Sequence, residues 1–347
     1  MSTENHSSEN NHTAEVVMIT GASAGIGRAT ARAFARRGAK IGLFARGGDR
    51  LEIVRAEVEE AGGRGLVLAG DVADDKAVEN AAQKLEDEFG PIDIWVNNAM
   101  VSVFSPIAEM TPEEFRRVTE VTYLGYVWGT LAALRRMRPR NRGTIINVGS
   151  ALAYRGIPLQ SAYCAAKHAI NGFTDALRCE LIHDRKDIRI CEVEMPAINT
   201  TQFEWVKSRL PNKPQPVPPI YQPEVAADAI IYAATHKRRE VYVGFPTVES
   251  IVGNKIAPRL LDRYLGRYCY QSQQTGEPDD PNRPNNLFDP VPGDFGAHGN
   301  FDARARKFSL QLWLNKRRDF LAGAVLIPTL AIAALLLLPK AKRQLHL

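Results

Sequence analysis

Tyr163 and Lys167 have the types and the spacing of a proton-transfer pair. They lie four residues apart in the stretch SAYCAAKHAI, so in a helix their side chains share one face. A free phenol has a pKa of about 10, and a neighbouring ammonium group lowers that pKa because it stabilises the phenolate. The pair could therefore act as a general acid and base toward a reacting oxygen. Taken alone, the two residues would be better interpreted as part of a solvated helix face.

The elements around this pair predict an α/β fold. Residues 14–268 alternate helical stretches with short β-rich runs, which are VVMIT, KIGLFAR, GLVLAGD, DIWVNNA, GTIINVGS, IRICEVEM and EVYVG. Repeated βα units build a parallel sheet with helices on both faces. We therefore expect these residues to form one domain with a Rossmann-like, doubly wound parallel sheet.

A glycine-rich turn follows the first of these runs. Gly21, Gly25 and Gly27 come directly after VVMIT and open a helical stretch. Glycine lets the backbone turn tightly and approach a pyrophosphate, while a helix amino terminus offers free N–H groups and a positive dipole end. Such turns also occur for packing reasons. The position between the first strand and a helix is what favours dinucleotide binding.

These features occur together with two others in a recognisable order. The spacing G-x-x-x-G-x-G is followed by NNA at residues 97–99, by Ser150 at the end of INVGS, and by Tyr163 with Lys167. Ser150 precedes Tyr163 by thirteen residues. In this order and spacing, residues 14–268 resemble the short-chain dehydrogenase/reductase family.

The resemblance implies an oxidoreductase that moves a hydride between a nicotinamide and a carbonyl or alcohol carbon. It implies that Tyr163 is the acid and base, that Lys167 lowers its pKa and holds the nicotinamide ribose, and that Ser150 orients the substrate oxygen. The residues that it assigns to the cofactor are Gly21, Ser23, Gly25, Ile26, Gly27, Arg46, Asp71, Val72, Asn98, Tyr163 and Lys167. A threonine near the carboxamide is also implied, with Thr200 and Thr201 as the two candidates.

Thr122 departs from the family's pattern. Family members commonly have an asparagine at this position, which helps to hold a water that links the lysine to solvent. The threonine hydroxyl is shorter but can still bond a water. The change leaves open a modified relay, a slower enzyme, or a membrane-tethered NADP(H)-binding protein without turnover. Intact Ser150, Tyr163 and Lys167 favour the enzyme.

The choice of cofactor depends on the end of the second strand. A carboxylate there binds the ribose hydroxyls of NAD, whereas an arginine accommodates the 2′-phosphate of NADP. The stretch LFARGGDRLE has Arg46 at this point and no acid before Asp49. We therefore expect NADP(H), although a solvated arginine would leave the preference open.

The substrate is indicated only by an insert and by composition. Residues 201–223 form a proline-rich stretch where the family covers its substrate, and its Phe203, Trp205, Leu210 and Tyr221 either line an apolar pocket or pack the insert on the domain. A lipophilic substrate such as a steroid, retinoid or fatty acyl derivative is expected. The formal charge of +5 is spread along the chain, so nucleic acid is not an expected partner. The four cysteines lack the spacing of a zinc site or a disulfide framework.

The two ends of the chain depart from globular composition. Residues 1–13 are polar and predict a disordered lead, and residues 269–300 are rich in Pro and Gly and predict a linker. Residues 301–319 resemble a basic amphipathic helix, either at a membrane surface or against the domain. Residues 320–339 carry no charge and are long enough to span a bilayer, and residues 340–347 form a basic tail.

Two expectations about location and assembly follow. The uncharged segment predicts a carboxyl-terminal membrane anchor. Basic residues flank it on both sides and favour neither orientation, so the catalytic domain is expected on the cytoplasmic side because residues 1–13 do not resemble a signal peptide. The family usually pairs subunits through the helices that carry Thr122 and Tyr163, so we expect a homodimer or homotetramer.

Overall fold

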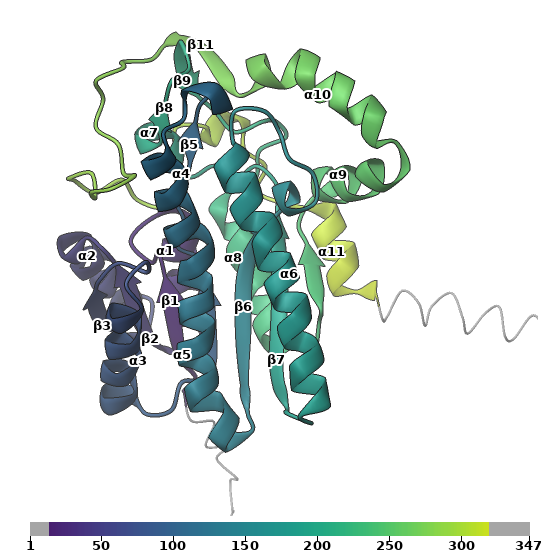
Figure 1. Ribbon diagram of the computed structural model, residues 1–347. Helices are drawn as coiled ribbons and strands as arrows, with labels where there is room; N and C mark the ends of the chain where they lie inside the picture. Colours follow the sequence, from purple (N-terminus) through teal and green to yellow (C-terminus); the bar gives the residue numbers. More distant parts are fainter. Residues whose placement is uncertain (1–13, 319–347) are drawn as a thin grey trace, which may run out of the picture.

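A single seven-stranded parallel sheet forms the centre of the molecule (Figure 1). The computed structural model describes residues 14–318. The strand order is β3-β2-β1-β4-β6-β7-β10. In chain order the strands are β1 (Val16–Thr20), β2 (Lys40–Ala45), β3 (Arg64–Ala69), β4 (Ile94–Asn97), β6 (Gly143–Ser150), β7 (Ile188–Met195) and β10 (Glu240–Tyr242). Each corresponds to one predicted run, so the predicted fold class is confirmed.

Helices cover both faces of this sheet, which explains why its strands read as continuous apolar runs. One face packs against α1 (Gly25–Ala35), α2 (Gly48–Glu60) and α8 (Pro223–Thr235) in one hydrophobic cluster. The other face packs against α3 (Asp75–Phe89), α5 (Gly125–Arg140) and α6 (Ser161–His183) in a second cluster. The helix α4 (Pro112–Thr119) continues through a π-helical turn, Glu120–Leu124, into α5.

The strand order reverses between β1 and β4, and this point positions the glycine-rich turn. In open parallel sheets, ligands bind in the crevice at such a reversal, beyond the carboxyl ends of the strands. Gly21 has a positive φ of 66°, and a Cβ there would come within 2.7 Å of the Ala99 Cα. Glycine at this position therefore lets the turn after β1 approach the loop after β4 closely.

The carboxyl-terminal third of the described chain builds a second layer above the sheet. Helices α9 (Phe245–Ile256) and α10 (Pro258–Ser272) pack on each other at the top of Figure 1. Two small sheets lie nearby: β9 (Asn212–Pro214) pairs with β11 (Gln274–Pro278), and β5 (Val103–Phe104) pairs with β8 (Lys207–Ser208). The short helix α7 (Gln202–Trp205) lies in the proline-rich insert.

Residues 269–300, expected to form a free linker, instead pack along the domain. They begin with the end of α10 and with β11, and Leu287 is fully buried in the second cluster. Asp294 forms an ion pair with the nearly buried Arg28, and Arg283 donates to the Val206 carbonyl at 2.7 Å. Arginines on both sides, from the domain and from the segment, thus bind carboxylate and backbone oxygens across this contact, although the segment forms little regular structure of its own.

The residues beyond this segment are described only in part. Helix α11 (Leu310–Lys316) buries Leu312 in the first hydrophobic cluster, and Lys316 binds Asp228 at 2.7 Å. The opposite side of α11 leaves Leu310 and Trp313 exposed. The predicted lead at 1–13, anchor at 320–339 and tail at 340–347 lie outside the described residues. Among residues 14–318, no helix combines the length and the apolar character needed to cross a bilayer.

Candidate active site

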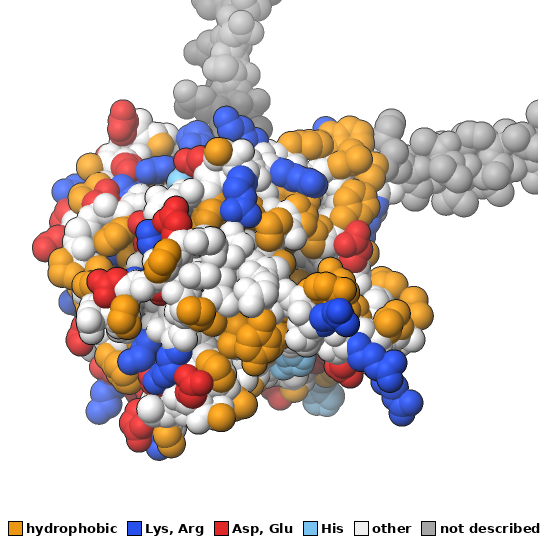
Figure 2. Space-filling model, turned by 90° about the horizontal axis from the view of Figure 1, so that it is seen from above, with side chains coloured by type: hydrophobic (Ala, Val, Ile, Leu, Met, Phe, Trp, Pro, Cys, Tyr) orange, Lys and Arg blue, Asp and Glu red, His pale blue; other side chains and the backbone are white. Residues whose placement is uncertain are grey.

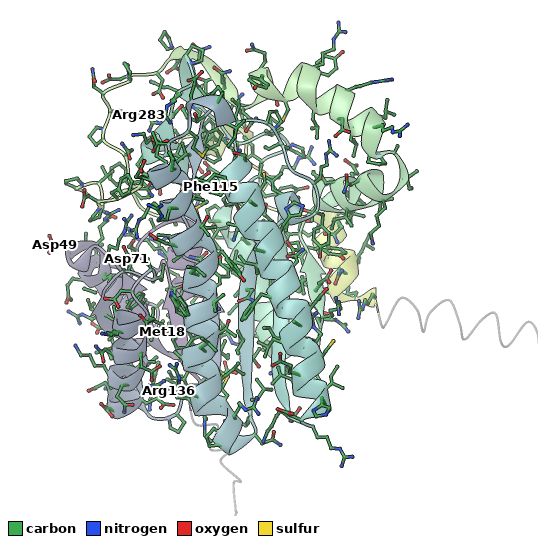
Figure 3. All side chains as sticks on the ribbon, in the orientation of Figure 1. Met18, Asp49, Asp71, Phe115, Arg136 and Arg283 are labelled. Carbon is green, nitrogen blue, oxygen red and sulfur yellow. The ribbon has the colours of Figure 1, made fainter. Side chains whose placement is uncertain are left out.

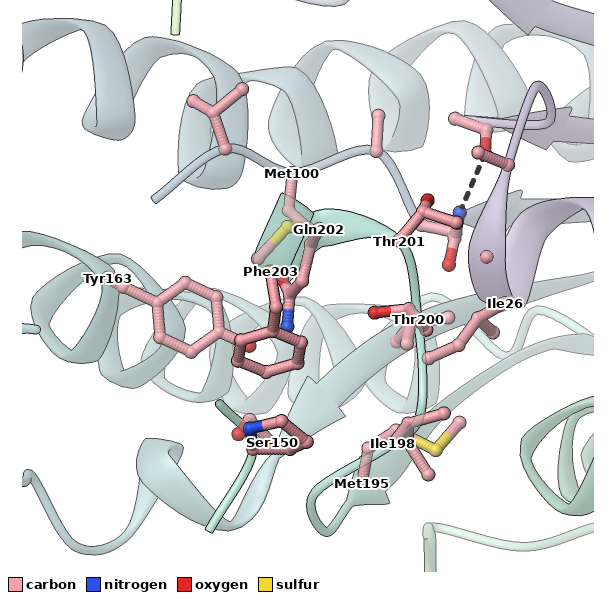
Figure 4. Close-up of a pocket in the computed structure, with 18 of the residues that line it drawn as sticks. Ile26, Met100, Ser150, Tyr163, Met195, Ile198, Thr200, Thr201, Gln202 and Phe203 are labelled. Carbon is pink, nitrogen blue, oxygen red and sulfur yellow. Dashed lines mark hydrogen bonds between the residues drawn. The ribbon is translucent and has the colours of Figure 1, made fainter. Parts of the chain in front are cut away.

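A cavity of about 410 Å³ opens at the carboxyl ends of the strands and brings together nearly all of the predicted site residues. The predicted residues that line it are Gly21, Ser23, Gly25, Ile26, Arg46, Asp71, Val72, Asn98, Ser150, Tyr163, Lys167, Thr200 and Thr201. Gly27 is not among the lining residues, because it lies behind the turn, where a Cβ would overlap the Gly21 carbonyl. Figure 4 shows Ser150, Tyr163 and Phe203 around the same space.

Ser150 and Tyr163 come to this cavity from neighbouring elements. Ser150 ends β6, and its hydroxyl accepts a hydrogen bond from the Leu152 backbone N–H at 3.1 Å, which fixes the turn after the strand. Tyr163 and Lys167 lie in the first two turns of α6, as their i,i+4 spacing predicts. The Lys167 side chain is only 2% exposed, and its Nζ donates to the Val148 carbonyl at 2.6 Å and to the Tyr126 hydroxyl at 3.0 Å.

The electrostatics of the pair differ from the sequence expectation that Lys167 lowers the pKa of Tyr163. Burial raises the pKa of Tyr163 above its ordinary value of 10.0, and the neighbouring Ser150 hydroxyl opposes that rise. Burial also lowers the pKa of Lys167 from 10.5 to about 7. Burial of the two side chains therefore opposes the charged forms, ammonium and phenolate, that the sequence expectation assigns to them.

The Thr122 hydroxyl is already hydrogen-bonded and is not free to act toward Lys167. Its Oγ1 donates to the Val101 carbonyl at 2.8 Å and accepts from the Val101 backbone N–H at 3.1 Å, and the residue is fully buried. The threonine thereby ties the π-helical turn to the loop after β4. Its only donor is used in this contact, which argues against an equivalent of the asparagine-held water relay at this side chain.

The glycine turn fits the pyrophosphate of a dinucleotide. Gly21 and Gly25 both have positive φ angles, of 66° and 55°, and α1 begins without a side-chain cap on its first N–H groups. Of these groups, the Gly25 N–H donates to the Gly296 carbonyl at 3.2 Å. Asn98 supports the turn by donating from its side-chain amide to the Thr20 and Gly21 carbonyls at 3.0 and 3.2 Å.

The adenosine end of the cavity is walled by the segment once expected to be a linker. Arg46 donates to the carbonyls of Asn286 and Phe288, each at 2.6 Å, and Asn286 itself lines the cavity. Asp71 forms a short ion pair with Arg117. Figure 3 shows Asp71 within the body of the molecule and Asp49 on its outer side, where Asp49 is exposed. The end of β2 therefore carries Arg46 at the position where an NAD-binding site carries a carboxylate.

Residues 15–209 match the family model described as short chain dehydrogenase. The chain belongs to the short chain dehydrogenase family. The family's members are oxidoreductases that use a nicotinamide cofactor. The glycine turn and the cavity lined by Ser150, Tyr163 and Lys167 lie at the carboxyl ends of the strands, where open parallel sheets bind their ligands.

Relatives of this short chain dehydrogenase include both curated proteins and solved structures. The uncharacterized oxidoreductase YxnA of Bacillus subtilis is 35% identical over 277 residues, which cover 79% of this chain and 78% of that protein. A fatty acyl-CoA reductase of Acinetobacter baylyi is 31% identical, with 71% and 81% covered. A metagenomic short-chain oxidoreductase in complex with NADP superimposes with a TM-score of 0.56 at 28% identity, covering 66% of this chain and 96% of that one.

Sequence reasoning missed three contributors to the site of this short chain dehydrogenase. They are the wall formed by residues 286–290, the Tyr126 hydroxyl on Lys167, and two buried acids in β7, Glu192 and Glu194. The acids had a signal in the sequence, because the run IRICEVEM carries two glutamates in a strand expected to be buried on both faces. The wall formed by residues 286–290 had no such signal in the sequence, since its contacts are made by backbone oxygens.

Proposed function

We propose that this short chain dehydrogenase uses NADP(H) to interconvert a carbonyl and an alcohol on a lipophilic substrate. The observation that carries the proposal is one cavity lined by Ser150 and Tyr163 and by the glycine turn with Arg46. A dinucleotide lying along that cavity would bring its reactive ring beside Tyr163.

The side chains around the reacting oxygen have separable roles in this proposal. A nicotinamide held in this cavity would supply or accept the hydride. Ser150 donates a hydrogen bond to the substrate oxygen, and Tyr163 gives that oxygen a proton in the direction of reduction and removes it in the direction of oxidation. Lys167 orients the ribose and restores the proton on Tyr163. Thr200 or Thr201 binds the carboxamide.

The preference for NADP(H) is supported by Arg46. Its guanidinium is held at the end of β2 by two neutral carbonyl oxygens rather than by a carboxylate, so its charge stays available to a 2′-phosphate. Burial lowers the pKa of Arg46, and the nearby Asp71, which is itself paired with Arg117, opposes that fall. The related structure that contains NADP is consistent with this preference.

The substrate class is supported by the apolar wall next to Tyr163. Phe203, Val217 and Leu265 line the cavity, so the insert and α10 both contribute apolar surface that would face a substrate. Trp205 also lines the cavity, but on the side of Arg50 in α2, whose guanidinium lies 5.3 Å from the centre of the Trp205 ring. Leu210 and Tyr221 are buried but do not line the cavity, so they pack the insert on the domain. The similarity to a fatty acyl-CoA reductase supports a long-chain acyl or similarly lipophilic carbonyl compound.

The proposal includes attachment to a membrane with the catalytic domain on its cytoplasmic side. The uncharged sequence of residues 320–339 supports it, as does the outer face of α9 and α10. Figure 2 shows hydrophobic and basic side chains mixed on the upper face of the molecule. Those exposed on α9 and α10 include Val252, Ile256, Leu260, Tyr264, Tyr268, Arg259, Arg263 and Arg267. Vesicle flotation of the full chain tests this, and a chain that stays in the aqueous fraction would refute it.

A homodimer or homotetramer through α5 and α6 is also proposed, because Leu131 and Ile182 on these helices are exposed in the single chain. Sedimentation of the full chain gives the assembly state directly, and a monomer at assay concentration would refute this part of the proposal.

The first experiment on function measures oxidation of NADPH and of NADH by the full chain with a panel of long-chain aldehydes and steroid ketones. The full chain is needed because residues 269–317 pack on the domain. We expect turnover with NADPH that Tyr163→Phe abolishes while NADPH binding persists. Binding of NADPH without turnover on any panel member would favour a nucleotide-binding protein instead.

A further inference from the structure

The loop that follows β7 contains a buried asparagine, Asn199. It is 0% exposed and directly precedes Thr200, one of the two threonines proposed to bind the carboxamide. Its backbone N–H donates to the Tyr221 carbonyl at 2.8 Å. Its other hydrogen bonds go to Gln222 and to residues 299–302, about a hundred positions further along the chain. The carboxyl-terminal part of the described chain therefore holds this loop.

Residues 298–302, which we call the brace, bind Asn199 at three points. The Gly299 N–H donates to the backbone carbonyl of Asn199 at 3.3 Å, and the Phe301 N–H donates to its side-chain Oδ1 at 3.1 Å. The Asn199 Nδ2 donates to the Asp302 Oδ1 at 2.8 Å. The acceptor and the donor of the Asn199 amide are thus both used, which fixes the orientation of the side chain.

The Oδ1 atom of Asp302 joins the brace to the domain. Besides the Asn199 amide, this oxygen binds the Gln222 Nε2 at 2.9 Å and the His298 Nδ1 at 2.8 Å. The Gln222 Oε1 accepts from the Asn199 Nδ2 at 3.1 Å, which closes a ring of three side chains. The other ring nitrogen of His298 binds Glu224 of α8 at 2.9 Å. Hydrogen bonds to a carboxylate are stronger than those between neutral groups, so Asp302 is the main anchor of this network.

Thr200 lies between the brace and the glycine turn. A Cβ on Gly25 would come within 3.2 Å of the Thr200 side chain, so the threonine packs directly on the turn. A Cβ on Gly299 would come within 2.5 Å of the Thr200 carbonyl oxygen, so glycine lets the brace approach the backbone of the loop. The position of Thr200 thus depends on contacts from both sides.

The brace also supports the side of the loop that faces the substrate. The Phe301 ring packs edge-on against the Phe203 ring, with the ring centres 6.0 Å apart. Figure 4 shows Phe203 and Tyr163 around the same cavity. None of the described residues 298–302 lines that cavity. The brace can therefore influence the site only through the loop that it holds.

We propose that Asp302 is a positioning residue for the nicotinamide end of the cofactor and that it acts through Asn199. By fixing Asn199, it fixes the backbone next to Thr200, so a carboxamide would meet a preformed contact. A loop without this anchor would have to be ordered on binding, at a cost in affinity. Asp302 lies outside residues 15–209, which the family model matches. The inference rests on the function proposed above.

The test measures the binding of two nucleotides to the full chain by titration calorimetry. One is NADPH, and the other is 2′-phospho-ADP-ribose, which lacks only the nicotinamide ring. The Asp302 side chain is 62% exposed, so Asp302→Ala removes little buried surface. The control, Asp187→Ala, removes an exposed carboxylate that binds Lys237.

We expect Asp302→Ala to raise the Kd for NADPH about tenfold and to leave the Kd for 2′-phospho-ADP-ribose unchanged. Asp302→Asn keeps an acceptor oxygen and should restore most of the affinity for NADPH. Asp187→Ala should change neither constant. Equal weakening of both nucleotides by Asp302→Ala, or no weakening of either, would overturn the proposal.

Amide hydrogen exchange without nucleotide provides a second measurement. We expect faster exchange at residues 197–203 in Asp302→Ala than in the wild type and in Asp187→Ala. Unaltered exchange in Asp302→Ala would show that Asp302 does not hold the loop. A wild type that binds neither NADPH nor NADH would refute the proposed function itself. A wild type that binds NADPH no more tightly than Asp302→Ala would refute only the role of Asp302.

Discussion

The Tyr126 hydroxyl lies between Lys167 and the backbone of β6: it accepts from the Lys167 Nζ at 3.0 Å and donates to the Val148 carbonyl at 3.0 Å. The Lys167 Nζ also lies 4.6 Å from the centre of the Tyr126 ring. One tyrosine therefore holds the buried ammonium group through both its hydroxyl and its ring.

Tyr126→Phe should weaken both activity and stability. The ammonium group loses one of its two acceptors, so we expect kcat to fall several-fold and the free energy of unfolding to fall by about 1 kcal/mol. Steady-state kinetics and urea denaturation measure the two effects. Tyr123→Phe, on the π-helical turn that precedes α5, is the control and should change neither; an equal effect of both variants would contradict the role of the Tyr126 hydroxyl.

Arg46→Ala should reduce the preference for NADPH. Loss of a charged partner for the 2′-phosphate is expected to raise the Kd for NADPH about tenfold to a hundredfold, while the Kd for NADH changes little. Quenching of tryptophan fluorescence reports both constants. The exposed Arg64 at the start of β3 provides the control, Arg64→Ala. Equal weakening of both nucleotides in Arg46→Ala would show that Arg46 only supports the wall at residues 286–288.

Asp294→Asn should loosen the segment that walls the adenosine end. The Arg28 side chain is 3% exposed, so its ion pair with Asp294 is shielded from water and should count for more than a surface pair. We expect faster amide hydrogen exchange across residues 286–296. The control Glu277→Gln breaks the exposed pair with Lys213 and should leave this exchange unchanged. Unaltered exchange in Asp294→Asn would mean that other contacts hold the segment.

Glu192→Gln should change how stability depends on pH. The folded protein keeps the Glu192 proton up to about pH 7, whereas the unfolded chain releases it near its ordinary pKa of 4.5. Between these values the unfolded state binds fewer protons, so the wild type loses stability as the pH rises. The Glu192→Gln variant has no carboxyl group at this position, so it does not lose stability in this way. Relative to the wild type, its free energy of unfolding should therefore rise by roughly 2 to 3 kcal/mol across that interval.

Chemical denaturation at a series of pH values measures this difference. Glu59→Gln, which removes an exposed carboxylate on α2, is the control and should show no such trend. A difference between Glu192→Gln and the wild type that stays constant across the interval would mean that Glu192 is ionised in the folded protein throughout.

The sequence predicted the sheet because its strands are buried on both faces, and an unbroken apolar run such as VVMIT carries that information locally. The sequence also predicted that Ser150, Tyr163 and Lys167 would lie close together. Their order and spacing place Ser150 at the end of one strand and Tyr163 and Lys167 on one helix. Spacing does not report burial, and burial of Tyr163 raises its pKa in a direction opposite to the one expected from a neighbouring lysine.

The wall at residues 286–290 shows the other limit of sequence reasoning. Its composition correctly indicates that the segment forms little helix or strand. Composition does not indicate that Arg46 and Arg117 will bind its carbonyl oxygens, because every residue offers such an oxygen. Contacts of this kind depend on where the chain runs, not on which side chains it carries.

The contact between Arg28 and Asp294 joins residues that are 266 positions apart. During synthesis on a ribosome, the glycine turn and the first strands emerge long before the segment that completes their cleft. The nascent domain must therefore keep an unfinished nucleotide site until nearly the whole chain has been made. A messenger truncated after codon 268 would yield a protein that has the sheet but lacks the wall of the cofactor cleft. We expect quality-control proteases to degrade such a partly ordered protein.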